Sequence, residues 1–262
     1  MIRIVCAALC VAFFISSGGR AQQNITPVPR QTILTELVTA NRILSNEGVI
    51  DAYGHVSVRD PANPGVFFLS RNIAPGSVTA ADILQYDLAG NAVAAGNAAS
   101  YSERFIHSEI YRARPDVMAV VHSHSDEVIP FSVTGVALRP LFHMAAFMGE
   151  GIPVFDPREA GSPGDLLVRR PEIGKALATK LGAKPGVLMR GHGAVAVAAG
   201  LHEAVARAYY LNVNARLQMQ SMQLAGAGQV HFLDAEESLQ SGPVDHYERA
   251  WGLWKQRVER GK

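Results

Sequence analysis

The chain has 262 residues, of which 48% are apolar, and its 24 lysines and arginines nearly balance its 23 aspartates and glutamates. This length is enough to bury one large core, and the balanced charge speaks against nucleic acid as a partner. The two cysteines, Cys6 and Cys10, lie near the N-terminus, in a segment that we expect to be removed. The rest of the chain has no thiol for a disulfide, a nucleophile or a metal ligand, so any metal must be held by histidine and carboxylate.

Residues 1–21 have the pattern of a secretory signal peptide. Arg3 supplies a positive charge, residues 4–15 form an uninterrupted apolar run of twelve, and Gly19 and Ala21 are the small residues that a signal peptidase requires. Twelve apolar residues are too few to span a bilayer. We therefore expect cleavage after Ala21, a periplasmic or secreted protein, and no contact of the mature chain with a membrane.

The rest of the chain is predicted to be a proline-containing leader at 22–31 and one α/β domain at 32–262. Apolar periodicity and turn residues predict helices at 32–47, 101–114, 126–133, around 177–181, at 201–224 and at 245–258. They predict strands at 56–59, 66–70, 85–88 and 117–121, and apolar runs at 187–189 and 194–198. Thr79 is the expected cap of a further short segment at 78–84. These elements interleave without a repeat or a long linker, which indicates a single domain.

The apolar strand at 117–121 ends in two histidines, His122 and His124. Because side chains alternate along a strand, both imidazoles are expected on the same side. Two imidazoles on one side of a core strand's end are half of a metal site, although an isolated pair is a weak signal.

Two further residues complete a candidate ligand set. His192 lies between Gly191 and Gly193, which permit a tight turn at a strand end, and Glu103 lies at the start of the helix that precedes the histidine strand. Taken singly, His192 is also explained as packed in a turn, and Glu103 as stabilising its helix dipole. Together the four side chains form a set that suits a divalent ion. The remaining histidines without such a pattern are expected at the surface: His202, His231 and His246.

Three stretches in this order resemble the class II aldolase and adducin family, which includes fuculose-phosphate aldolase and ribulose-phosphate epimerase. They are Tyr101-Ser102-Glu103-x₃-His107-x₆-Arg114-Pro115-Asp116, Ala119-Val120-Val121-His122-Ser123-His124, and Gly191-His192-Gly193. The resemblance extends over about residues 32–224 and implies an α/β/α fold with a central, mainly antiparallel sheet. It also implies a homotetramer with sites at subunit interfaces. Carried over by position, it makes His122, His124 and His192 the metal ligands and Glu103 the acid/base carboxylate, which can also bind the resting metal.

The sequence departs from the sugar-phosphate aldolases of this family at their phosphate site. Those enzymes have Gly-Asn where this chain has Gly54-His55, a Thr/Ser-Gly loop where it has Ser70-Arg71, and two serines where it has Tyr101-Ser102. Their tyrosine proton donor falls near His143, where this chain has no tyrosine. A phosphate cradle needs backbone N–H groups and small hydroxyls, so cleavage of a sugar phosphate is not expected.

The replacements resemble the family branch that decarboxylates hydroxylated aromatic or pyridine carboxylates. Arg71 offers a planar fork for a carboxylate, although a surface salt bridge also explains it, and His55 and Tyr101 add polar or stacking groups. His143 is interpreted as a proton donor or as a core histidine. We predict a lyase that removes CO₂ from a small hydroxylated carboxylate through a metal-stabilised enolate. It would hold one divalent ion per chain; three imidazoles favour Zn²⁺, and Mn²⁺, Co²⁺ or Fe²⁺ would also fit.

Three other functions stay open at this point. An aldolase acting on an unphosphorylated hydroxy-ketone or keto acid meets the same electronic demand, because it also leaves an enolate. The resemblance further includes iron-dependent oxygenases that act on prenylated hydroxyphenylpyruvates. It also includes the non-catalytic adducin head, which lacks the ligands that are present here.

Overall fold

The computed structural model describes residues 28–93, 96, 98–162, 164–241 and 247–261. The predicted signal peptide and most of the predicted leader lie outside these residues and stay predictions. The leader's last two residues belong to the first helix, α1 (Arg30–Asn46). Among the helices that are described, none combines the length and the apolar character that crossing a membrane requires.

The core of the fold is a single eight-stranded sheet with the order β4-β3-β2-β1-β5-β8-β7-β6. Its strands are β1 (His55–Arg59), β2 (Val66–Ser70), β3 (Ile83–Asp87), β4 (Ala92–Val93), β5 (Ala119–Ser123), β6 (Val154–Phe155), β7 (Gly186–Met189) and β8 (Gly193–Ala198). Neighbouring strands are antiparallel except β6 and β7, which are parallel. The predicted α/β fold with a mainly antiparallel sheet is therefore confirmed.

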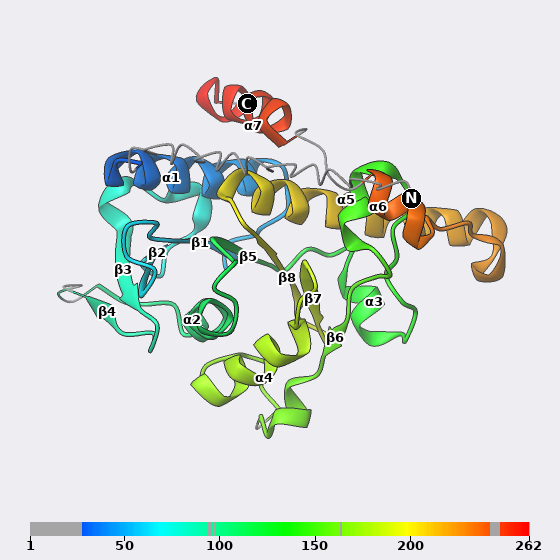
Figure 1. Ribbon diagram of the computed structural model, residues 1–262, viewed down its shortest axis with the longest axis horizontal. Coiled ribbons are helices and arrows are strands. Elements are labelled where there is room, and N and C mark those ends of the chain that lie inside the picture. Colours follow the sequence, from blue (N-terminus) through cyan, green and yellow to red (C-terminus); the bar gives the residue numbers. More distant parts are fainter. Residues whose placement is uncertain (1–27, 94–95, 97, 163, 242–246, 262) are drawn as a thin grey trace, which may run out of the picture.

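Helices cover both faces of the sheet (Figure 1). Besides α1 they are α2 (Arg104–Ala113), α3 (Ile129–Val133), α4 (Pro171–Leu181), α5 (Leu201–Ala225), α6 (Ala235–Ser241) and α7 (Tyr247–Glu259). α1 and α5 lie on one face, with α7 packed outside them, and α2 and α4 lie on the other. Alternation along β1 decides which residues meet which layer: Val56 and Val58 face α1 and α5, whereas His55 and Ser57 face α2.

The segment at 78–84 differs from its prediction. Thr79 is a cap, because its backbone N–H and its hydroxyl both donate to the Asp82 carboxylate. The helix that it begins is only one 3₁₀ turn, Ala80–Asp82, and β3 starts immediately afterwards at Ile83. Pairing of β3 with β2 takes up these residues, since a short apolar run suits either element and the tertiary partner decides between them.

Candidate metal centre

The end of β5 brings His122 and His124 together. His122 lies in the middle of the sheet, opposite His55 of β1 and Val195 of β8, and is completely buried. His124 comes just after the strand ends. The two Nε2 atoms are 3.1 Å apart, so the imidazoles lie on the same side, as the alternation of strand side chains requires.

His192 joins them from the turn between β7 and β8. Gly193 makes this approach possible, because a Cβ atom at that position would lie 2.0 Å from the carbonyl oxygen of Ser123. Gly191 has a positive φ of 62°, which favours glycine. As a result the Nε2 atom of His192 lies 3.1 Å from that of His124.

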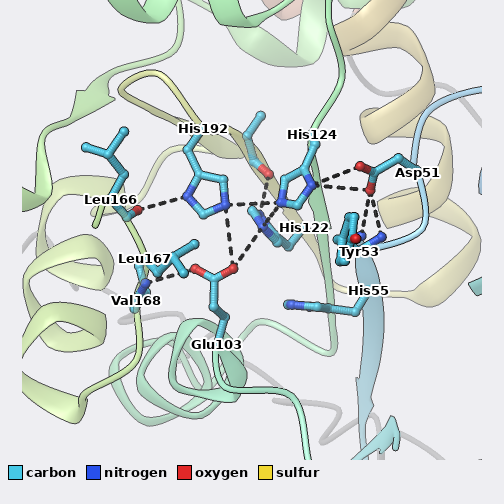
Figure 2. A network of polar contacts seen from close by, with 12 residues as sticks. Asp51, Tyr53, His55, Glu103, His122, His124, Leu166, Leu167, Val168 and His192 are labelled. Carbon is cyan, nitrogen blue, oxygen red and sulfur yellow. Dashed lines mark hydrogen bonds and ion pairs between the residues drawn. The ribbon is translucent and has the colours of Figure 1, made fainter. Parts of the chain in front are cut away.

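Glu103 supplies the carboxylate from the position just before α2 (Figure 2). Its Oε2 atom is 3.5 Å from Nε2 of His192 and 3.9 Å from Nε2 of His122. Its Oε1 atom accepts the backbone N–H of Val168 at 2.8 Å. The four predicted side chains therefore place their ligand atoms within 4.8 Å of one another.

The second nitrogen of each imidazole decides which atom faces the centre. Each Nδ1 lies next to an oxygen that only accepts: the carbonyl of Ala194 at 3.1 Å for His122, the carbonyl of Leu166 at 3.0 Å for His192, and the Asp51 carboxylate at 3.2 Å for His124. Each Nδ1 must therefore carry a proton, so a neutral ring turns its Nε2 lone pair inward. Three lone pairs that meet at about 3 Å repel one another unless a cation lies between them, so the donor set fits a divalent metal ion.

The protonation states of Glu103 and His122 also suit the binding of a metal ion. Burial would raise the pKa of Glu103, but its hydrogen bond with His192 and the nearby imidazoles outweigh burial and lower that pKa to about 2. Burial lowers the pKa of His122 well below its usual value. Burial also opposes a proton on His192, but Glu103 outweighs it and raises the pKa of that imidazole. At neutral pH the centre therefore holds a carboxylate beside the neutral His122.

The loop before α4 has a strained backbone where it meets the centre. Leu166 has a φ of 61°, and it is the only residue other than glycine with a positive φ in the described parts of the chain. This conformation is unfavourable for a branched side chain. The same loop makes two hydrogen bonds to the centre, one between the Leu166 carbonyl and His192 and one from Val168 N–H to Glu103. The strain therefore occurs where the loop positions two residues of the centre.

Two of the predicted substrate residues, His55 and Tyr101, lie next to the centre. The His55 ring centroid is 4.9 Å from that of His122 and 4.5 Å from that of Tyr101, and the Tyr101 hydroxyl donates to the carbonyl of Ile73. Arg71 follows β2, and its Nε donates to Asp82 at 2.6 Å. Arg71 therefore forms a salt bridge through Nε, as one of its two interpretations proposed. A role of Arg71 in binding substrate stays a prediction.

His143 lies apart from the centre within this chain. It is at the start of a 3₁₀ segment, His143–Met148, and lines a separate hollow together with Tyr209, Tyr210 and Trp254 of α5 and α7. Its role toward substrate stays a prediction.

Sequence reasoning missed two residues of the loop between α1 and β1. Asp51 accepts the backbone N–H groups of Tyr53 and Gly54 with Oδ1 and turns Oδ2 toward His124. Tyr53 is 70% exposed, and its ring centroid lies 6.4 Å from that of His124. The only sequence signal was their position just before Gly54, and it did not indicate which residue of another element they would meet.

Comparisons with known proteins agree with the resemblance seen in the sequence. The model of the family described as Class II Aldolase and Adducin N-terminal domain matches residues 35–219. The chain belongs to this family. Decarboxylase tropJ of Talaromyces stipitatus is 37% identical over 257 residues, which cover 89% of this chain and 97% of that protein.

A second relative and a solved structure extend the comparison. The 3,4-dihydroxyphthalate decarboxylase of Arthrobacter keyseri is 30% identical over 220 residues, covering 78% of this chain and 85% of that protein. The crystal structure of an aldolase II superfamily protein from Pseudomonas syringae has a TM-score of 0.75 at 23% identity, covering 89% of this chain and 95% of that one. The structural match supports the fold, and the family with its named relatives identifies this protein as an enzyme of the lyase type.

Proposed function

We propose that this protein is a divalent-metal-dependent decarboxylase of small, hydroxylated aromatic carboxylates. The observation that carries the proposal is the convergence of three imidazole Nε2 atoms and the Glu103 carboxylate within 4.8 Å. Two relatives that cover most of this chain are named decarboxylases, and one of them is named for a dihydroxylated aromatic diacid. The names of these two relatives favour loss of CO₂ over cleavage of an aldol.

Loss of CO₂ leaves a negative charge that the centre must stabilise. The ring carbon that bears the carboxyl group first takes up a proton, which converts the neighbouring hydroxyl into a ketone. The bond to the carboxyl carbon then breaks, CO₂ leaves, and the electron pair moves to the ketone oxygen and restores the aromatic ring. His122, His124 and His192 would hold the ion through Nε2. When bound, a divalent ion supplies a Lewis acid for this negative charge. Water then returns a proton to this oxygen and completes the reaction.

Glu103 is the proposed proton carrier. One of its oxygens is held by Val168 N–H, and the other faces His192 and His122. With a pKa of about 2 it rests as a carboxylate, which is a weak base. A substrate that separates it from these imidazoles would raise its pKa, so that it takes the proton of the hydroxyl and returns it to the ring carbon.

Metal analysis with an assay of CO₂ release tests the function. We expect one divalent ion per chain in protein purified without chelator, and CO₂ release from 3,4-dihydroxyphthalate or dihydroxybenzoates. His122→Ala should lose both, whereas His231→Ala, which changes an exposed histidine, should keep both. Aldehyde release from a hydroxy-keto acid without any CO₂ release would replace this proposal by the aldolase alternative.

The cellular location and the assembly belong to the same proposal. The pattern of residues 1–21 supports export and cleavage after Ala21, and the family resemblance supports a homotetramer that acts on small molecules. N-terminal sequencing of the exported protein and its mass in solution by light scattering test these two statements. An uncleaved N-terminus or a monomer would contradict them.

A further inference from the structure

A buried chain of hydrogen bonds runs beside the metal centre, between β1 and α2. The Tyr111 hydroxyl lies 2.7 Å from Ser57 Oγ, Ser57 Oγ lies 2.6 Å from Nδ1 of His107, and Nε2 of His107 lies 2.7 Å from Nδ1 of His55. None of these four side chains is more than 1% exposed. We call Tyr111, Ser57, His107 and His55 the relay.

The direction in which the relay's hydrogen bonds are donated follows from Tyr111, the end of the relay farthest along the chain of contacts from the metal centre (its inner end). Burial raises the pKa of Tyr111, so its hydroxyl keeps its proton. Within the described residues, Ser57 Oγ is the one hydrogen-bond acceptor of that hydroxyl. Tyr111 therefore donates to Ser57, and the single proton of Ser57 is left to donate to Nδ1 of His107.

The same reasoning assigns the tautomers of both histidines. A neutral His107 that accepts at Nδ1 carries its proton on Nε2 and donates it to Nδ1 of His55. His55 then accepts at Nδ1 and carries its own proton on Nε2. Burial lowers the pKa of His107 to about 3, and no carboxylate among the described residues hydrogen-bonds to either ring. Because Nδ1 of each ring accepts a hydrogen bond, each ring carries its single proton on Nε2.

The outer end of the relay lies at the metal centre. The His55 ring lies between those of Tyr101 and His122, and Figure 2 shows it reaching below the histidine cluster toward Glu103. No residue that the structure describes accepts a hydrogen bond from its Nε2 atom. A protonated Nε2 has no lone pair for a metal, and His55 is not among the four residues whose ligand atoms converge.

We propose that the relay holds His55 as a neutral donor whose Nε2–H binds the substrate oxygen on which negative charge develops. The inference rests on the proposed function for the identity of that oxygen. Ser57, His107 and Tyr111 are then positioning residues, and His55 touches the substrate. A neutral imidazole suits this task, because its donor is already oriented and no buried positive charge has to be desolvated. The site would select an oxyanion and disfavour an amine or another cation.

Nuclear magnetic resonance on ¹⁵N-histidine-labelled, zinc-loaded protein tests the tautomers without any turnover. Two-bond proton–nitrogen correlations distinguish the Nε2–H form, the Nδ1–H form and the imidazolium. We expect both His55 and His107 in the Nε2–H form at neutral pH. Either ring in the Nδ1–H form, or as an imidazolium, would overturn the proposal.

A matched pair of tyrosine variants tests the role of the inner end. Tyr111 and Tyr86 both pack on Phe67, with ring centroids 5.2 Å and 5.3 Å from it, and the Tyr86 hydroxyl takes no part in the relay. Tyr111→Phe should add Nδ1–H signals for His55, because the relay loses the proton that directs it, whereas Tyr86→Phe should not. A His55 tautomer that is unchanged in both variants would refute positioning by the relay.

Binding of 4-nitrocatechol to zinc-loaded protein, followed by its absorption, tests the donor toward an oxyanion. Because a hydrogen bond to a charged group is worth about 1.5–3 kcal/mol, His55→Ala should weaken binding about tenfold or more at unchanged zinc content. His55→Gln, which keeps an N–H donor, should recover part of this loss. Equal binding by His55→Ala would refute the donor role. None of these three experiments needs decarboxylation, so the relay and the proposed function fail independently.

Discussion

The two faces of the sheet are both buried, yet they differ in chemistry. Under α1 and α5 the two central strands β1 and β5 present mainly apolar side chains, such as Val56 and Val121. Under α2 the same two strands present Ser57, His55 and His122, which reach partners on α2 or at the metal centre. Because β1 and β5 are paired in register, with His55 opposite His122, one end of one face collects the polar groups. One face of these strands thus carries the candidate metal centre, whereas apolar side chains form a core on both faces.

The largest effect is expected from Glu103→Gln, on the face of the sheet that carries the candidate metal centre. Loss of a positioned acid or base reduces turnover by about 10²–10⁴-fold, and the amide keeps the size of the side chain. CO₂ release and zinc content of the same preparation should show low turnover with the metal retained. Glu109→Gln changes a buried carboxylate within α2 and should leave turnover near wild type. Full turnover in Glu103→Gln would remove the proton-carrier role.

The apolar face should respond in stability and not in chemistry. Leu37 of α1 is fully buried in the core of that face, so Leu37→Ala should lower the free energy of unfolding by about 2–5 kcal/mol. Urea unfolding measures this loss, and zinc content below the transition should stay at one ion per chain. Loss of zinc at unchanged fold would show that the two faces are coupled.

A smaller effect is expected in the loop that orients the centre. The backbone conformation of Leu166, with φ 61°, is unfavourable for leucine but not for glycine, whereas Leu167 has no positive φ. Leu167→Gly should therefore destabilise the protein by about 1 kcal/mol more than Leu166→Gly, since a left-handed backbone costs a branched residue roughly this amount. Thermal unfolding of the two variants gives the difference. Equal losses would mean that the Leu166 backbone stores no strain.

The smallest effect concerns the helices on the apolar face. His202 of α5 lies 2.8 Å from Glu248 of α7 and 3.6 Å from Glu36 of α1, and its ring stacks on Trp251 at 3.9 Å. Burial opposes its charge, but the two carboxylates outweigh burial and raise the pKa of His202 above 6.5. The protonated form therefore stabilises the fold fully below the unfolded pKa, and this contribution disappears as the pH rises through the folded pKa.

The expected size of this contribution is about 0.5 kcal/mol, because the pairs are partly exposed and screened by solvent. The difference in unfolding free energy between wild type and His202→Gln should be larger near pH 5.5 than near pH 8.5. Urea titrations followed by tryptophan fluorescence measure it. A difference that does not change with pH would contradict the role of the charged form.

Local spacing in the sequence determined the elements and the outline of the centre. Alternation along β5 places His122 and His124 on one side, the glycines around His192 indicate a tight turn, and Glu103 lies just before α2. These inferences need only the period of a strand or the conformational freedom of glycine, which neighbouring residues decide.

Only the tertiary structure decided which distant groups meet. His55 and His107 are 52 residues apart, and nothing in their local pattern indicates that packing of α2 on β1 joins them. In the same way, the pairing of Arg71 with Asp82 and the contact of Asp51 with His124 join residues from different elements. His202 was expected at the surface, but it lies between two carboxylates. Periodicity states which side of an element a residue faces, but its partner depends on which elements pack there. The side chains of the candidate metal centre were therefore predictable from sequence motifs and the family resemblance, whereas the direction of the relay beside them required the fold.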